Sequence, residues 1–174
     1  MKKATGEELA RIAKELALTP FHGNIEGEVS NIAPLIAHFP KWSAEAAEDA
    51  WCAAFVYHCV LLAGYEIPYS PEECVTCSLA GCGGWEEFAM GDERVGYYKE
   101  STSFVPKEGD IVLFDRVFSG VEHDHIGVVL KASEDTLITA EGNMGKRSRI
   151  VTRKRDEHIR AFIRLPDGYR YGTR

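Results

Sequence analysis

The amino-acid sequence predicts an α+β fold, in which helices come first and strands follow. Helical patterns cover residues 5–18, 28–38 and 49–63, whereas strand-like segments begin only after residue 109. Because the two kinds of segment are segregated along the chain, alternating βαβ units are not expected. The length of 174 residues and a hydrophobic content of 45% suit a single domain with one substantial core.

The first helix is predicted from its cap and its apolar periodicity. Thr5 and Glu8 have capping-box spacing. Apolar residues recur on one helical face, at Leu9, Ile12, Ala13 and Leu16. The second helical segment, 28–38, is interrupted by Pro34, which fits the first turn of a helix that starts there.

The segment 49–63 is the strongest helix of the sequence. It is rich in Ala, Cys, Leu and Val and apolar all round, which predicts a central, buried helix. Asp49 is the expected N-cap, which places Cys52 in the first turn. Free N–H groups and the positive end of the helix dipole stabilise a thiolate at such a position.

The second half of the chain is expected to be irregular first and extended afterwards. Residues 65–109 are rich in Gly, Cys and Pro and predict no regular element. Val and Ile enrichment predicts four strands, at 110–114, 125–132, 136–140 and 159–165. Residues 166–174 are expected to form a surface tail.

One predicted hairpin joins segments 125–132 and 136–143. If its turn is centred on Glu134, His125 pairs with Asn143, and Glu141 lies two residues along the same face. The opposite, core-facing side then holds Ile126, Val128, Leu130, Ile138, Ala140 and Gly142. A two-residue turn would instead reverse the faces of the partner strand.

Charge and hydropathy exclude several function classes. A net charge of −7 gives no attraction to nucleic acid or to an anionic membrane, so neither is an expected partner. No run of about 18 apolar residues predicts a membrane span. The basic N-terminus lacks the apolar stretch of a signal peptide. We therefore expect cytoplasmic synthesis, with delivery by phage lysis or a secretion system if the substrate lies outside.

Cysteine usage predicts free thiols and no metal. The five cysteines (52, 59, 74, 77 and 82) are an odd number, unlike a secreted disulfide framework. Cys74 and Cys77 form half of a zinc knuckle and Cys82 offers a third ligand, but no fourth follows. The segment after Asp115 lacks the spaced carboxylates of a calcium loop. We expect no cofactor.

A thiol, an imidazole and an orienting group follow one another along the chain. Cys52 precedes His125, which precedes Glu141 and Asn143. An imidazole that takes the proton of a thiol makes it a strong nucleophile, and a third group holds the imidazole in the required tautomer. His123 is the alternative imidazole, and the sequence leaves open whether Glu141 or Asn143 contacts the ring.

These residues lie in motifs that resemble those of CHAP domains, which are papain-like cysteine amidases and peptidases that cut the peptide part of bacterial peptidoglycan. Four motifs carry the resemblance, in order along the chain: Trp51-Cys52-Ala53-Ala54-Phe55-Val56, Gly109-Asp110-Ile111-Val112-Leu113-Phe114-Asp115, Asp124-His125-Ile126-Gly127-Val128-Val129 and Glu141-Gly142-Asn143. The resemblance implies a papain-like α+β fold, with the nucleophile on a central helix packed against an antiparallel sheet or half-barrel. It divides the chain into an N-terminal helical extension (1–45), a catalytic domain (46–166) and a C-terminal tail (167–174).

The resemblance also implies roles for the site residues. Cys52 is the expected nucleophile, His125 the general base, and Glu141 and Asn143 the groups that orient the imidazole. Trp51 and Trp85 are candidate substrate-binding walls, with core packing as the alternative. No Gln or Asn shortly precedes Cys52, so the second oxyanion donor stays unassigned.

The function implied is that of a cysteine-dependent amidase or endopeptidase acting on peptidoglycan stem or cross-link peptides through a thioester. Two alternatives stay open: a thiol hydrolase of another peptide or small amide, and an inactive papain-fold binding module. The basic run 146–155 is expected to be a solvated hairpin face, or to hold an anionic substrate group.

Overall fold

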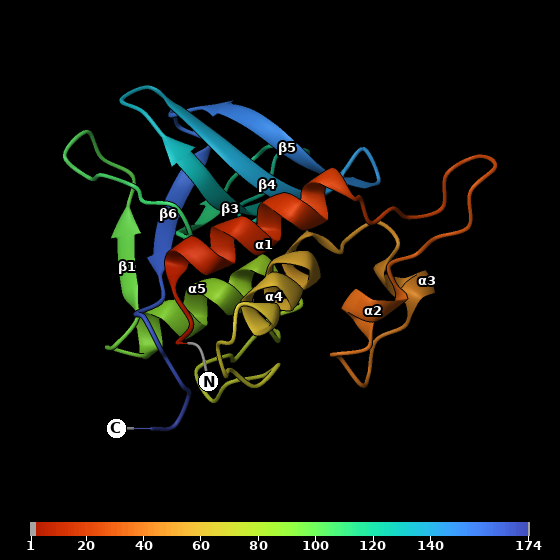
Figure 1. Cartoon of the computed structure of the whole chain (residues 1–174), viewed down its shortest axis with the longest axis horizontal. Coiled ribbons are helices and arrows are strands. Elements are labelled where there is room, and N and C mark those ends of the chain that lie inside the picture. The colour runs from red at the N-terminus through yellow and green to blue at the C-terminus, as the bar shows by residue number, and fades with distance from the viewer. Residues whose placement is uncertain (1–2, 174) are drawn as a thin grey trace.

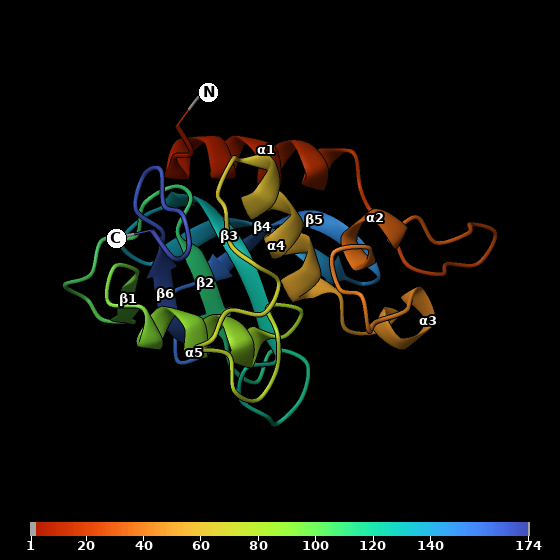
Figure 2. The ribbon, with the colours of Figure 1, turned by 90° about the horizontal axis from the view of Figure 1, so that it is seen from below.

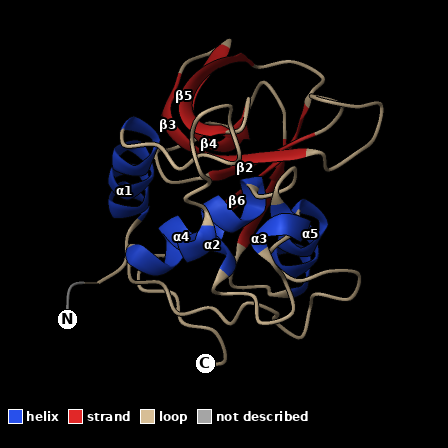
Figure 3. Ribbon diagram, turned by 90° about the vertical axis from the view of Figure 1, so that its right-hand side faces the viewer, coloured by secondary structure: helices blue, strands red, loops and turns tan. Residues whose placement is uncertain are grey.

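A computed structural model describes residues 3–173 and shows helices packed against one antiparallel sheet, the predicted α+β class (Figure 1). The helices are α1 (Gly6–Leu18), α2 (Ala33–Ile36), α3 (Ala44–Ala47), α4 (Cys52–Leu62) and α5 (Cys82–Gly91). The strands are β1 (Gly96–Lys99), β2 (Ile111–Phe114), β3 (His125–Ala132), β4 (Thr136–Met144), β5 (Arg147–Lys154) and β6 (Ile159–Arg164). The six-stranded sheet has the order β1-β6-β2-β3-β4-β5, and it curls over the helices (Figure 3).

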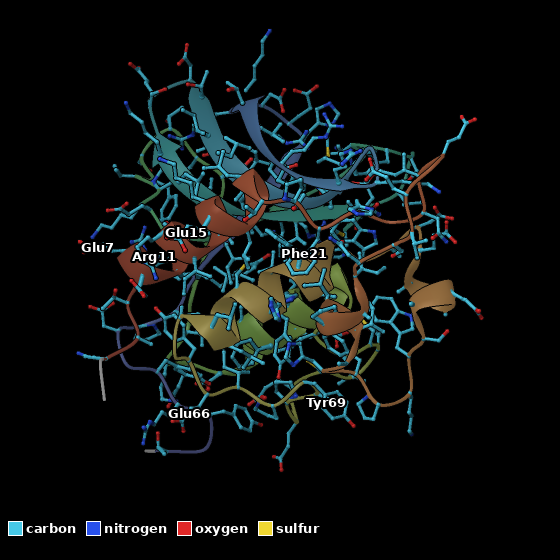
Figure 4. All side chains as sticks on the ribbon, turned by 45° about the vertical axis from the view of Figure 1, so that its right-hand side comes forward. Glu7, Arg11, Glu15, Phe21, Glu66 and Tyr69 are labelled. Atoms are coloured by element: carbon cyan, nitrogen blue, oxygen red, sulfur yellow. The ribbon has the colours of Figure 1, made fainter. Side chains whose placement is uncertain are left out.

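The helix α1 matches its prediction. The Thr5 side chain accepts a hydrogen bond of 3.1 Å from the Glu8 N–H, which caps the helix. Its apolar face packs against α4 and the strands β3, β4 and β5. Glu7, Arg11 and Glu15 lie on the outer side (Figure 4), where Arg11 pairs with Glu15 and with Glu8. The helix therefore closes one side of the core.

The helix α4 begins at Cys52 and not at Asp49, so the predicted N-cap is wrong. Residues 48–50 instead belong to the turn that follows α3, in which the Ala50 N–H donates to the Ala47 carbonyl. Asp49 is exposed and pairs with Lys146 at 3.8 Å. Trp51 occupies the cap position without a side-chain hydrogen bond. As predicted, α4 is central, since it packs against β3 and β4 on one side (Figure 2).

The expectation of an irregular segment over 65–109 is wrong in two places, because α5 and β1 lie within it. Glycines at the start of α5 lower helix propensity. One of them, Gly84, packs so closely that a Cβ would lie 2.2 Å from the Ser78 carbonyl oxygen. Trp85 and Phe88 are fully buried on this helix. Tertiary packing therefore outweighs the weak propensity.

The β3–β4 hairpin combines a two-residue turn with a bulge. The Ser133 N–H donates to the Thr136 carbonyl at 2.9 Å, so the turn is not centred on Glu134 as predicted. Leu130 is the extra residue of a bulge between Val129 and Lys131. Beyond this bulge, Val128 pairs with Ala140, which is the predicted register.

Because the bulge cancels the shift introduced by the turn, the site end of the hairpin keeps its predicted faces. Ile126, Val128 and Ala140 lie in the main core, between the sheet and the helices. Ile138, on the turn side of the bulge, is only partly buried and is not among the main-core residues. The opposite face of the sheet holds a smaller core: Val112, Phe114, Val129, Leu137, Ile159 and Phe162.

The C-terminal segment is packed and not a free surface tail. Tyr169 is 5% exposed and its hydroxyl donates to Asp92 Oδ2 at 2.5 Å. The Gly168 N–H donates to the Ala4 carbonyl at 2.7 Å, which ties the two ends of the chain together. Within residues 3–173, no helix is both long and apolar enough to cross a bilayer.

Candidate active site

Cys52 opens onto a cleft of about 220 Å³ between the first turns of α4 and α5 and the start of β3. The cleft is lined by Asp49, Ala50, Cys52, Ala80, Gly81, Cys82, Phe118, His123, Asp124, His125 and Asn143. A larger hollow of about 780 Å³ lies near the start of α1, but it contains none of the predicted catalytic residues. The cleft around Cys52 is therefore the candidate site.

His125 is the first residue of β3 and is fully buried. Its ring stacks on Phe114, with ring centroids 5.9 Å apart, and meets the edge of Phe118 at 4.9 Å. Phe114 is its cross-strand partner, so the β2–β3 register fixes one side of the imidazole. The ring is consequently held in one orientation before any substrate binds.

Glu141, and not Asn143, contacts the imidazole. Its Oε2 lies 2.7 Å from His125 Nε2, and this carboxylate is completely buried. Arg153 donates to both carboxylate oxygens, at 2.7 and 2.6 Å, and the Thr139 hydroxyl donates to Oε1 at 2.7 Å. A carboxylate that only accepts hydrogen bonds requires the proton on Nε2.

The other ring nitrogen, Nδ1, is buried and has no well-aligned hydrogen-bond partner among residues 3–173. With Nε2 bound to Glu141, Nδ1 is the atom available for the proton of Cys52. Apo enzymes often hold such catalytic contacts in loose geometry. The arrangement therefore contains a thiol, a base and a carboxylate that sets the tautomer of the base.

The pKa values favour an ion pair of Cys52 and His125. The hydrogen bond from Cys82 lowers the pKa of the Cys52 thiol most, burial opposes it, and His125 lowers it further, to about 5. Burial lowers the pKa of His125, but Cys52 and Glu141 outweigh it and raise it to about 9. Burial likewise opposes ionisation of Glu141, yet Arg153 and His125 hold its pKa at about 2.

These values predict the pH dependence of alkylation at Cys52. The thiolate forms as pH rises through about 5, so the rate of reaction with iodoacetamide should reach half of its plateau near that pH. A further change is expected near pH 9, where His125 loses its proton. Peptide mapping of protein that has been labelled at pH values from about 4 to about 10 gives the alkylation rate at each cysteine. A rate at Cys52 that rises only where ordinary thiols ionise would contradict the ion pair.

The Glu-Gly-Asn motif has a steric basis. A Cβ on Gly142 would lie 2.5 Å from Phe55 Cβ, so α4 packs directly on the β4 backbone next to Glu141. A Cβ on Gly127 would lie 2.8 Å from Glu141 Cγ. Gly127 therefore makes room for the Glu141 side chain, and Gly142 allows α4 to pack closely against β4. Asn143, which has a φ of 57°, lies at the register shift that follows and lines the cleft.

Cys82 is a cleft residue that sequence reasoning left out of the site. It is the first residue of α5, and its sulfur lies 3.9 Å from the sulfur of Cys52. The sequence assigned it only to a possible zinc ligand set. Among residues 3–173, no group of three or more potential ligands is placed to hold a metal ion. Cys74 instead donates to the Gly84 carbonyl at 3.3 Å.

His123 belongs to a second His–carboxylate pair. Its Nε2 lies 2.7 Å from Glu86 Oε1, and Arg160 and the Tyr97 hydroxyl bind Oε2 of the same carboxylate. His123 has a φ of 55°, an unfavourable conformation for a residue with a side chain. The structure thus places His125, and not His123, with Glu141, while both rings reach the cleft.

Two of the predicted substrate contacts are corrected. Trp51 and Trp85 are both fully buried and do not line the cleft, so they are core residues. Trp85 donates to the Leu79 carbonyl at 3.0 Å and stacks edge-on with Tyr57 and Phe88. The exposed aromatic side chain of the cleft is Phe118, on the loop before β3.

The basic run is also only partly solvated. Arg153, on β5, is largely buried against Glu141 and lies over the Phe114 ring, 4.7 Å from its centroid. The two-residue alternation of β4 and β5 could have predicted this contact. Arg153 pairs with Leu137, which lies on the same face of the sheet as Thr139 and Glu141. The basic run therefore contains two largely buried arginines, Arg153 paired with Glu141 and Arg155 paired with Glu100.

A comparison with known protein families shows to which family this chain belongs, because residues 44–143 match the CHAP domain. The chain belongs to the CHAP family. The match covers Cys52, His125, Glu141 and Asn143, and it ends before Arg153. CHAP proteins are amide-bond hydrolases, so the thiol, imidazole and carboxylate of this cleft lie in a domain of that class.

The fold resembles that of a solved structure, Ly7917, at low sequence identity. Ly7917 matches with a TM-score of 0.53 and 15% identity over 93% of this chain and 62% of Ly7917. A second structure of Ly7917, described as containing the hydrolyzing product of MDP, gives a TM-score of 0.33, 23% identity and coverage of 41% and 32%. The chain thus spans less than two thirds of Ly7917. No curated protein sequence matches.

Proposed function

We propose that this CHAP protein is a cysteine-dependent amidase or endopeptidase that cleaves amide bonds in peptidoglycan stem or cross-link peptides through a thioester. The observation that carries the proposal is that Cys52 and His125 line one cleft, and that hydrogen bonds continue from His125 through Glu141 to Arg153. Action on the wall, outside the cytoplasm, is part of the same proposal.

The proposed reaction begins with the Cys52 thiolate attacking the amide carbonyl carbon. The N–H of Cys52 is at the free end of α4, where it can donate to the oxyanion that forms. His125, already protonated in the ion pair, gives its proton to the leaving amine. Water, deprotonated by His125, then hydrolyses the thioester and restores the thiolate.

Three further groups have supporting roles in this proposal. Glu141 keeps the Nε2 proton in place and stabilises the imidazolium. Arg153 keeps Glu141 ionised in a buried setting. The amide of Asn143 lines the cleft without a hydrogen bond to His125, so we assign it to substrate binding and no longer to orienting the ring.

A thiol hydrolase of a non-wall amide is the second candidate. The net charge of −7 favours it, because an anionic wall is weakly repelled by a chain of the same sign. The cleft volume of about 220 Å³ admits only a few side-chain-sized groups, which both substrate classes satisfy.

Digestion of purified peptidoglycans that differ in cross-link chemistry tests the proposal. We expect new amine and carboxyl termini at one bond type, identified by mass spectrometry of the released fragments. The matched control is the same protein alkylated at Cys52 near pH 6, about one unit above the pKa at which its thiolate forms. Intact walls of every type, with fast alkylation of Cys52 retained, would reject the wall substrate and favour the second candidate.

A further inference from the structure

The cleft contains a second thiol that the proposed hydrolysis does not use. Cys82 Sγ lies 3.9 Å from Cys52 Sγ, and the two residues are the first residues of α5 and α4. Cys82 is 7% exposed, whereas the neighbouring Cys77 is exposed. The two sulfurs thus meet at the point where two helix N-termini converge.

We propose that Cys52 and Cys82 form a site of reversible oxidation, in which a peroxide oxidises Cys52 and Cys82 closes a disulfide with it. The inference rests on the proposed function in one respect, namely that Cys52 is a thiolate in the resting protein. It adds a modification that hydrolysis does not require.

The chemistry balances in two steps. The Cys52 thiolate attacks one oxygen of hydrogen peroxide, the O–O bond breaks, and the leaving hydroxide takes the proton held by His125 and departs as water, with Cys52 left as the sulfenic acid. Cys82 then attacks the Cys52 sulfur, the S–O bond breaks, and the thiol proton leaves with the hydroxyl group as water. Two thiols lose two electrons in total, and one peroxide becomes two waters.

The distance is suited to the second step. A disulfide has a sulfur–sulfur bond of about 2.05 Å, so the two atoms must approach by roughly 2 Å. Each cysteine is the first residue of its helix, so rotation of its side chain moves the sulfur without breaking the helix. Cys59 lies two turns further along α4 and is fully buried with a strongly raised pKa, so it does not compete.

Oxidation of Cys52 also prepares Cys82 for attack. The hydrogen bond to Cys52 raises the pKa of Cys82 most, followed by burial and by the negative charge on Cys52. A sulfenic acid at Cys52 is neutral and so removes the charge that opposes ionisation of Cys82. Oxidation of Cys52 therefore removes one cause of the raised pKa of Cys82, and the disulfide protects Cys52 from irreversible oxidation.

Treatment of the whole chain with hydrogen peroxide, followed by alkylation and peptide mapping without reductant, tests the site. We expect a Cys52–Cys82 cross-linked peptide, loss of the fast iodoacetamide reaction at Cys52, and recovery of both thiols with dithiothreitol. Cys82→Ser should yield no such cross-link and should accumulate Cys52 with two or three added oxygens, which dithiothreitol does not remove. Cys82→Ala serves as the second variant if the serine protein fails to fold.

The matched control is Cys77→Ser, which changes the exposed thiol of the same segment and should form the cross-link as the unsubstituted chain does. Irreversible oxidation of Cys52 in the unsubstituted chain, without a Cys52–Cys82 peptide, would overturn the inference. So would a cross-link that joins Cys82 to Cys77 instead. Because the readout is mass and not wall digestion, either result leaves the proposed function untouched.

Discussion

Cys52→Ala should lower the rate of amide hydrolysis by on the order of 10⁴-fold or more, because it removes the proposed nucleophile that forms the thioester. The fold should persist, since Cys52 is a partly exposed first residue of α4 and alanine favours a helix. The measurement is the rate of fragment release from a cleavable substrate, together with the thermal unfolding midpoint of the same preparation.

Cys77→Ala is the matched control for this prediction, because Cys77 is an exposed thiol that plays no part in the proposed reaction. Its hydrolysis rate should equal that of the unsubstituted chain. Unchanged hydrolysis in a folded Cys52→Ala protein would remove the thiol mechanism altogether. In that case the chain would act through another nucleophile.

Glu141→Gln should lower the hydrolysis rate by roughly 10³- to 10⁴-fold, by analogy with neutralisation of the carboxylate in a catalytic triad. The substitution preserves shape but removes the charge that stabilises the His125 imidazolium and that pairs with Arg153. The pKa of His125 should fall from about 9, so the ion pair with Cys52 weakens. The pH profile of iodoacetamide alkylation at Cys52 reports this shift separately from hydrolysis.

Glu86→Gln is the corresponding change at the second pair, where Glu86 contacts His123. We expect a smaller loss of rate and an alkylation profile at Cys52 that keeps its midpoint near pH 5. A larger loss at Glu86 than at Glu141 would make His123 the functional base. Comparison of the two variants therefore shows whether His125 or His123 is the functional base.

The order of motifs and the two-residue period of the strands predicted that His125 lies beside the segment of Glu141 and Asn143, but not which of these two residues contacts the ring. The register at Val128 and Ala140 agrees with the prediction, although the predicted turn centred on Glu134 is wrong and the bulge at Leu130 restores the pairing. That agreement depends on the hydrophobic faces, because a one-residue slip would turn every side chain over. The α+β class followed from the same patterns.

The predictions that were wrong or incomplete have one common cause, because the role of each of these residues depends on tertiary packing. Trp51 directly precedes Cys52 and Trp85 lies in the segment between the motifs, but both are fully buried core residues, and sequence alone does not report burial. Cys82 and Arg153 join the site through helix and strand placement, at sequence separations that no local motif spans. The glycines at the start of α5 lower its helix propensity, so the sequence did not predict the helix that begins at Cys82.

The bulge at Leu130 determines which parts of the hairpin tolerate a change of length. Residues 134 and 135 at its tip lie beyond the bulge, so an insertion there lengthens the turn and leaves the His125 end paired as before. Removal of Leu130 should instead shift the pairing of residues 125–129 with β4 by one position, so that His125 and Glu141 no longer meet on the same face. Leu130, an unpaired residue five positions from His125, thus acts as the spacer that keeps His125 and Glu141 on the same face of the sheet.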